Sequence, residues 1–185
     1  TIIEIHPEMQ TTDILPSINL THLKTMTDSF GIFQFANFEK PNKKFGYTLD
    51  DNARALVVAC LLKNHLLIRK YLNFIKKCQL SDGAFVNYIS FPKKIFTIQN
   101  KNEDIEESYS RALWGVCSVL STKELEPDLY EVALKIFNKA LPHAKNFEHL
   151  RAKALAIKAL SLVCNLETVR RNVLLNLITA HADSL

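Results

Sequence analysis

The segment Asp50–Leu62 reads DDNARALVVACLL, and its pattern indicates how the whole chain is built. After the acidic start, apolar side chains fall on every side of a helix, and Arg54 is the only charged residue among them. A helix without a polar face is buried on all sides. We therefore expect an inner helix over residues 50–63, covered by other helices.

Elsewhere in the chain, helices with a single apolar stripe alternate with helices that are apolar all round. The striped patterns lie at residues 17–29, 65–79, 128–143 and 167–183, and the other inner helices at residues 105–121 and 148–164. In a double-layered array, outer helices cover the seams between inner helices. The sequence therefore predicts an all-α fold, an (α/α) hairpin array of about seven helices.

Composition favours one domain. With 185 residues, 48% of them apolar, the chain can bury a sizeable core, and we expect one domain over residues 17–185 after an extended lead-in at residues 1–16. The net charge of +4 is modest and the lysines are scattered, which argues against a nucleic-acid partner. No apolar run is long enough to span a membrane, and no signal peptide is visible, so we expect no membrane partner.

The cysteines indicate a reducing compartment. Cys60, Cys78, Cys117 and Cys164 lie far apart without CxxC spacing, which is typical of buried thiols rather than of disulfides or zinc ligands. Glycine-rich phosphate loops are also missing from the sequence. We therefore expect a cytoplasmic protein with no bound metal and no cofactor.

The inner helices all begin on the same face, so their polar first turns should share one rim. Carboxylates and amides bind hydroxyl groups, and aromatic rings stack on sugar rings. The candidate catalytic carboxylates are Asp50, Asp51, Glu106 and Glu107. The candidate substrate-binding residues are Tyr47, Asn52, Arg54, Asn87, Tyr88, Ser108, Arg111, Trp114, His149 and Arg151.

A structural interpretation of the same residues stays open. Asp50 with Arg54 and Glu107 with Arg111 are spaced for ion pairs within one helix, and acids are ordinary in a first turn. We expect Asp50 to be the helix N-cap. Asp51 and Glu107 would then face the cleft, with Arg54 and Arg111 orienting them. Glycoside hydrolysis needs one protonated carboxyl group, which burial favours, and a second carboxylate.

Four motifs resemble a bacterial domain that is found in, or attached to, proteins assigned to the group 1 glycosyltransferases. They are Thr21–Asp28, Phe45–Leu56, Asp82–Tyr88 and Glu106–Trp114. That domain looks like an (α/α) toroid of the six-hairpin glycosidase type, and the resemblance covers about residues 17–160. Tyr109 and Ser110 stand where the related pattern has His-Gly, and only Arg151 is kept from its Ser-Pro-Arg motif.

This resemblance implies a role in carbohydrate metabolism. We expect a glycoside hydrolase-like domain that binds or cleaves an oligosaccharide in a carboxylate-rich cleft, with a fused or associated glycosyltransferase as a partner. Three and a half hairpins do not close a six-hairpin toroid, so we expect the chain to be part of a larger one. The alternative is a non-catalytic helical-repeat module that docks a glycosyltransferase or another protein.

Overall fold

The computed structural model describes residues 17–164, 166 and 171–185. Over these residues the protein is all-α, as predicted, with seven helices. They are α1 (Thr21–Met26), α2 (Leu49–Leu61), α3 (His65–Cys78), α4 (Glu106–Leu120), α5 (Pro127–Ala144), α6 (Leu150–Val163) and α7 (Arg171–Ala182). The strands are β1 (Ala36–Asn37), β2 (Lys40–Pro41), β3 (Tyr47–Thr48) and β4 (Tyr88–Ile89). The predicted lead-in at residues 1–16 and the start of the last predicted helix lie outside the described residues.

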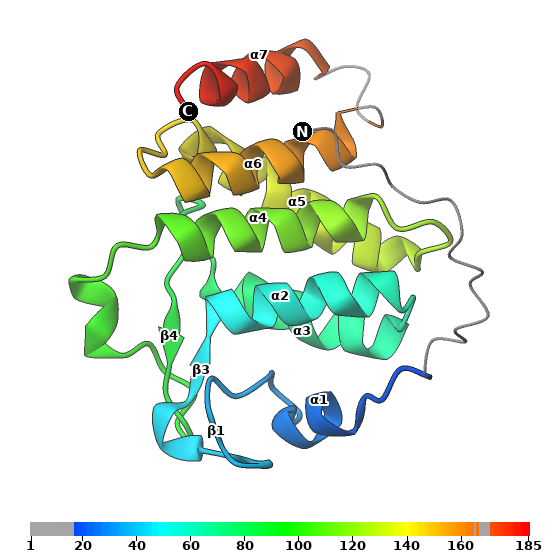
Figure 1. Cartoon of the computed structure of the whole chain (residues 1–185), viewed down its shortest axis with the longest axis vertical. Helices are drawn as coiled ribbons and strands as arrows, with labels where there is room; N and C mark the ends of the chain where they lie inside the picture. The colour runs from blue at the N-terminus through cyan, green and yellow to red at the C-terminus, as the bar shows by residue number, and fades with distance from the viewer. Residues whose placement is uncertain (1–16, 165, 167–170) are drawn as a thin grey trace, which may run out of the picture.

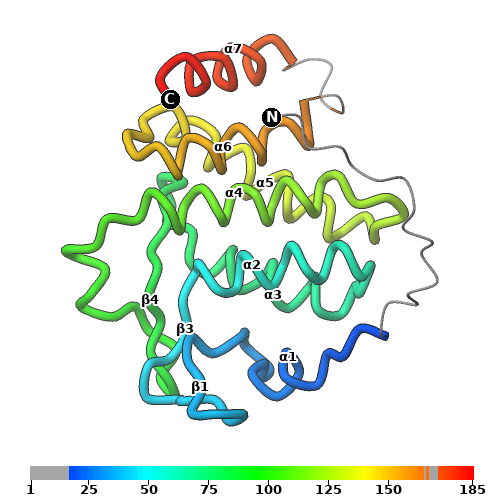
Figure 2. Tube along the Cα trace, in the orientation of Figure 1, coloured from blue at the N-terminus to red at the C-terminus, as the bar shows by residue number. Residues whose placement is uncertain are grey.

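Helices α2, α4 and α6 lie side by side and run in the same direction (Figure 1). Helix α3 packs on α2 and α5 packs on α4, so these two form a second layer behind the first (Figure 2). Helix α7 packs on α6 at the end of the stack. The alternation of inner and outer helices is therefore confirmed from α2 to α7, whereas α1 contacts β2, and the inner helices all begin at the same edge of the molecule.

Burial of the inner helices is less complete than the sequence predicts. The central helix α4 is buried over most of its length, and Gly115 lets it lie close to α2, because a Cβ there would be 3.1 Å from the carbonyl oxygen of Ala53. Helix α2 exposes Val58 and Leu61, and α6 exposes Leu162. These two helices keep an open strip because the described chain places no further element over it.

The first helix is shorter than the predicted range of residues 17–29. Leu20 at its N-cap offers no side-chain hydrogen bond, and Thr27 has extended backbone that bridges to Ile32. The Asp28 carboxylate then accepts hydrogen bonds from the backbone N–H groups of Phe30, at 2.7 Å, and Gly31, at 3.1 Å. This Asx-type turn ends the helix by offering backbone groups an alternative partner.

The two long loops before α2 and α4 contact each other through an antiparallel pair. Strand β3 pairs with β4, with Tyr47 opposite Ile89 and Thr48 opposite Tyr88. Strands β1 and β2 form a separate two-stranded sheet. Because β3 leads directly into α2, the β3–β4 pair fixes the start of α2 against the loop that precedes α4.

The four cysteines are buried and unpaired, as the sequence predicts. Among the described helices, none combines the length and the apolar character that crossing a bilayer requires. In the same part of the chain, no group of three or more His, Cys, Asp or Glu side chains is arranged to hold a metal ion.

Candidate functional site

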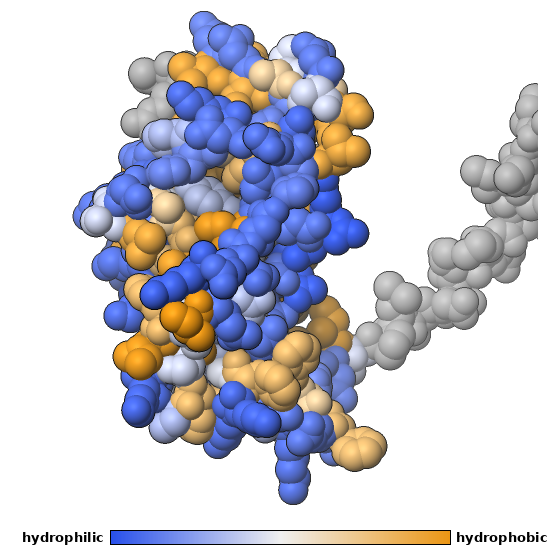
Figure 3. All heavy atoms as spheres, turned by 90° about the vertical axis from the view of Figure 1, so that its left-hand side faces the viewer, coloured by the Kyte–Doolittle hydropathy of each residue, from blue (hydrophilic) through white to orange (hydrophobic). Residues whose placement is uncertain are grey.

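A polar cavity of about 540 Å³ opens at the edge where the inner helices begin. Much of this face is hydrophilic (Figure 3). The predicted site residues that line the cavity are Asp50, Asp51, Arg54, Asn87, Tyr88, Glu107, Ser108, Arg111 and His149. Five further residues, which were not predicted from the sequence, also line it: Gln34, Phe35, Thr48, Glu103 and Asp104.

Thr48, not Asp50, is the N-cap of α2, so that prediction was wrong. The Thr48 hydroxyl accepts a hydrogen bond from the backbone N–H of Asp51 at 3.2 Å and donates one to the Asp51 carboxylate at 2.5 Å. The backbone N–H of Asp50 donates instead to the Asn87 side chain, at 3.2 Å. Because Asn87, just before β4, accepts the backbone N–H of Asp50, the Asp50 carboxylate is not needed as a cap and lines the cavity.

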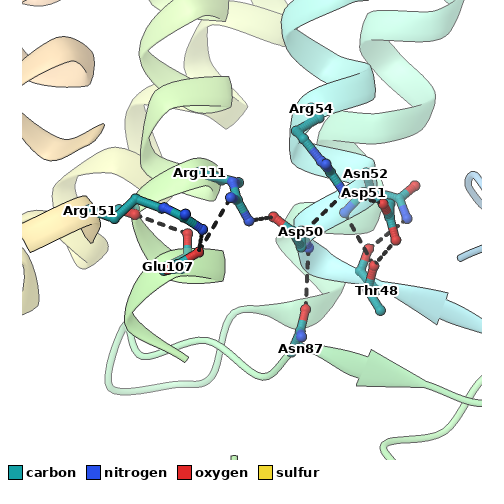
Figure 4. A network of polar contacts seen from close by, with 10 residues as sticks. Thr48, Asp50, Asp51, Asn52, Arg54, Asn87, Glu107, Arg111 and Arg151 are labelled. Atoms are coloured by element: carbon teal, nitrogen blue, oxygen red, sulfur yellow. Dashed lines mark hydrogen bonds and ion pairs between the residues drawn. The ribbon is translucent and has the colours of Figure 1, made fainter. Parts of the chain in front are cut away.

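Arg111 joins the carboxylates of two helices (Figure 4). Its guanidinium lies 2.6 Å from Asp50 of α2 and 3.3 Å from Glu107 of its own helix. Arg151 of α6 reaches the same Glu107 oxygen at 3.1 Å. The acid-plus-arginine helix starts therefore do share one rim, and ion pairs connect all three inner helices across it.

Asp51 is the carboxylate with the most distinctive environment. Arg54 lies 2.5 Å from Asp51 and 3.1 Å from Asp50. Burial raises the pKa of Asp51, and the neighbouring Asp50 charge adds to the rise, although Thr48 and Arg54 oppose it. Asp51 therefore keeps its proton to a higher pH than an ordinary surface aspartic acid, which is the property that a proton donor needs.

Glu106 does not line the cavity. Its carboxylate accepts hydrogen bonds from the backbone N–H groups of Glu148 and His149, both at 2.8 Å, and so holds the chain just before α6. His149 contacts Asp104, which raises the pKa of His149. The pKa of Asp104 is lowered, first by the backbone N–H of Glu106 and then by His149. The predicted preference for Glu107 over Glu106 agrees with this arrangement, whereas Asp50 and Asp51 both line the cavity.

Tyr47 was expected at the cleft, but it is fully buried. Successive side chains of a strand point to opposite faces. Thr48 and Tyr88 therefore line the cavity, while Tyr47 and Ile89 point into the core. The Tyr47 hydroxyl donates to the Asp28 carboxylate at 2.6 Å, and both burial and this bond raise the pKa of Tyr47.

Asn52 is also fully buried, which makes its predicted role in ligand binding wrong. Its side chain accepts a hydrogen bond from the Ile32 backbone N–H at 2.9 Å and donates to the carbonyls of Ile32, at 3.1 Å, and Thr48, at 2.8 Å. These bonds tie the turn after α1 to the first turn of α2, so Asn52 has a structural role.

Trp114 lies outside the polar cavity and lines a separate groove further along the inner helices. It follows Glu107 by seven residues, which places it about 10 Å further along the helix axis. Phe35, at 48% exposed, and Tyr88, which donates to Glu103 at 2.9 Å, are the aromatic residues that line the cavity. Arg151 does not line it but reaches it through Glu107.

Tyr109, which stands at the histidine position of the resemblance, faces away from the cavity. Its hydroxyl is buried and donates toward the carbonyls of Gly83, at 3.0 Å, and Ala140, at 2.9 Å. Its ring packs edge-on against Phe85. Tyr109 therefore holds the loop before β4 against α5 and has no contact with the site.

No protein-family model matches the chain, and no curated protein matches its sequence. Any functional interpretation therefore depends on the residues and their arrangement.

Proposed function

We propose that this chain is a carbohydrate-active domain that binds an oligosaccharide in the polar cavity and cleaves it as a glycoside hydrolase. The observation that carries the proposal is the convergence of carboxylates from two inner helices. Asp50 and Asp51 of α2 and Glu107 of α4 line one cavity. Arg111 forms ion pairs with Asp50 and Glu107 and so connects the two helices. A layer of parallel inner helices backed by outer helices also supports our proposal that the fold is part of an (α/α) toroid, with a fused or associated glycosyltransferase as a partner.

The environments of the carboxylates suggest different roles. Asp51 is the proton donor in this proposal, because burial raises its pKa. Glu107, on the neighbouring helix, supplies the second carboxylate that hydrolysis of a glycosidic bond requires. Arg111 and Arg151 hold Glu107 in place, and Arg54 holds Asp51.

The charges of the cavity favour a neutral or amine-bearing sugar over an acidic one. Both guanidinium groups that line it, those of Arg54 and Arg111, are already paired with carboxylates. The carboxylates outnumber them; they are Asp50, Asp51, Glu103, Asp104 and Glu107. An anionic sugar would therefore meet net negative charge and no unpaired guanidinium in the cavity lining, whereas hydroxyl or ammonium groups can donate to the carboxylates.

Screening a panel of neutral, amino and acidic oligosaccharides for binding and hydrolysis tests this proposal. We expect Asp51→Asn and Glu107→Gln to lower kcat/KM about 10²- to 10⁴-fold while the protein stays folded. Asp128→Asn is the matched control, because Asp128 pairs with Arg69 on the outer helices and lies away from the cavity. Hydrolysis that is unchanged in both rim variants would refute the catalytic roles.

A specific observation favours the second candidate, a non-catalytic helical-repeat module. The ion pairs Arg111–Asp50 and Arg151–Glu107 connect neighbouring inner helices, which a scaffold also requires. For such a module, Asp51→Asn and Glu107→Gln would lower the melting temperature, and no sugar of the panel would bind to the unaltered protein.

A further inference from the structure

A second cavity, which we call the apolar groove, lies toward the opposite ends of the inner helices. Its volume is about 540 Å³, which is within the range of roughly 300 to 1,000 Å³ of small-molecule sites. Its lining begins at Val57 and Trp114, each three residues, or about 5 Å along the helix, beyond Arg54 and Arg111 of the polar cavity, and it extends past the C-terminal ends of α2 and α4. The groove shares no lining residue with the polar cavity.

The floor of the groove is apolar. Val57 and Leu61 of α2, Trp114 of α4 and Leu162 of α6 line it. Leu61 is 80% exposed and Leu162 is 38% exposed, so the described chain leaves these side chains in contact with water. Each would gain about 25 cal/mol per Å² of apolar surface covered by a ligand.

The charged groups of the groove all have one sign. Lys63, Lys123 and Lys158 line it, and its described lining contains no Asp or Glu. Within the described residues, no ion pair involves any of these lysines. The Cys60 thiol adds no negative charge, because burial raises its pKa to about 11.

Lysines near the ends of helices are common, because they offset the negative end of the helix dipole. That explanation suits Lys63 and Lys123, which follow α2 and α4. It does not suit Lys158, because the last turn of α6 contains no basic residue and Lys158 lies earlier in the helix. Its ammonium instead sits over the Trp114 ring, 3.9 Å from the ring centroid, and so places a cation directly on the apolar floor.

The hydroxyl groups of the groove already donate to carbonyl groups of α4. Ser118 donates to the carbonyl of Trp114 at 2.8 Å, and Thr122 donates to the carbonyl of Ser118 at 2.8 Å. Ser121 donates to the same Ser118 carbonyl at 3.1 Å. The groove therefore offers cations and apolar surface but few directed polar groups, which is a poor lining for a sugar or a nucleobase.

We propose that the apolar groove binds an amphiphilic anion, a single-chain fatty carboxylate. The chain would cover Leu61, Leu162 and the edge of Trp114, and the carboxylate would lie among the three lysine ammonium groups. This site is independent of the proposed sugar chemistry.

Trp114 makes the test direct, because it is the only tryptophan in the chain. Decanoate, kept below its critical micelle concentration, is titrated into the full chain while Trp114 fluorescence and binding heat are measured. Decanol and decyltrimethylammonium provide the same apolar chain with no charge and with positive charge. We expect saturable binding of decanoate that weakens with added salt, weaker binding of decanol, and no binding of the cation.

Variants separate the charge from the apolar surface. Lys158→Gln and Lys123→Gln are each expected to weaken decanoate binding about fivefold, the upper end for a partly exposed ion pair, and to leave decanol binding unchanged. Lys135→Gln, at an exposed site on α5, is the matched control. Calorimetry provides the readout for Lys158→Gln, because that substitution alters Trp114 fluorescence itself.

Three outcomes would overturn the proposal. Equal affinity for decanoate and decanol, insensitive to both lysine substitutions, would reduce the groove to a non-selective apolar patch. Self-association that buries Trp114, seen by analytical ultracentrifugation, would make a second copy of the chain the occupant. Loss of decanoate binding in Asp51→Asn, with the fold intact, would mean that decanoate occupies the polar cavity. Retained binding would show that the fatty-acid site and the proposed sugar site are different sites.

Discussion

Replacing Asn52 with alanine is expected to destabilise the protein strongly, although the substitution removes little volume. Asn52 is fully buried and makes hydrogen bonds to the backbone N–H and C=O of Ile32 and to the C=O of Thr48. Alanine leaves the Ile32 N–H without its acceptor, and a buried donor without a partner costs about 1 to 3 kcal/mol. The loss of the two bonds to carbonyls adds to this cost.

Together these losses amount to about 2 to 4 kcal/mol of unfolding free energy. In a domain of this size, 1 kcal/mol shifts Tm by about 2 to 4 °C, so a decrease of about 5 to 15 °C is expected. Urea unfolding followed by circular dichroism measures the free energy, and hydrogen exchange of the Ile32 amide reports the broken bond. Asn73→Ala, at an exposed position of α3, is the matched control.

A Tm for Asn52→Ala within about 2 °C of the control, together with unchanged exchange at Ile32, would refute this reasoning. It would show that the turn after α1 finds other partners. The predicted role of Asn52 in ligand binding would then become open again.

Two further predictions concern the supports of the site. Tyr47→Phe should cost about 1.5 kcal/mol at pH 7, because it removes a hydrogen bond to the Asp28 carboxylate. Burial opposes the ionisation of Asp28, but the hydrogen bonds from Tyr47, Phe30 and Gly31 lower its pKa. The stabilisation is therefore fully present above the unfolded-state pKa of 3.8 and is lost as the pH falls through the lower folded-state pKa. Urea unfolding at pH 7 and pH 3 should therefore show a smaller penalty at pH 3, and an equal penalty would contradict the assignment. Gly83→Ala should lower stability by at least about 2 kcal/mol, since φ is +97° and a Cβ would lie 2.1 Å from the Lys139 carbonyl oxygen; a Tm unchanged from wild type in a thermal melt would show that the loop relaxes freely.

The sequence contained enough information for the helical layers and for part of the rim. Apolar patterns located α2 through α6 to within a few residues, because one-sided and all-round burial leave different periodicities. The shared rim followed from the parallel direction of the inner helices. The N-cap of α2 could also have been found, since Thr48-Leu49-Asp50-Asp51 has the spacing of a capping box, with Thr48 as the cap and Asp51 three residues later.

The errors arose where the position of a side chain depends on contacts between distant segments. Nothing local shows that β3 pairs with β4, and this pairing decides that Tyr47 points inward and Thr48 outward. Asn52 is buried because the turn at Ile32, 20 residues earlier, packs over it. Trp114 was assigned to the rim by residue type, whereas its distance along α4 from Glu107 already placed it elsewhere.

The parallel direction of the inner helices explains part of the clustering of carboxylates at the rim. Three helix N-termini at one edge bring together three positive dipole ends, which carboxylates stabilise. Asp50, Asp51 and Glu107 meet this requirement in the first turns of α2 and α4, and the Glu106 carboxylate, also in the first turn of α4, accepts a backbone N–H just before α6. A first-turn position accounts for a charged Asp51, but burial raises the pKa of this half-buried carboxyl group, and Glu103 lies in the loop before α4, so dipole compensation explains neither the raised pKa nor Glu103. The proposed sugar ligand would account for these two features, and for this reason Asp51→Asn tests an enzyme against a scaffold more sharply than any substitution at Asp50.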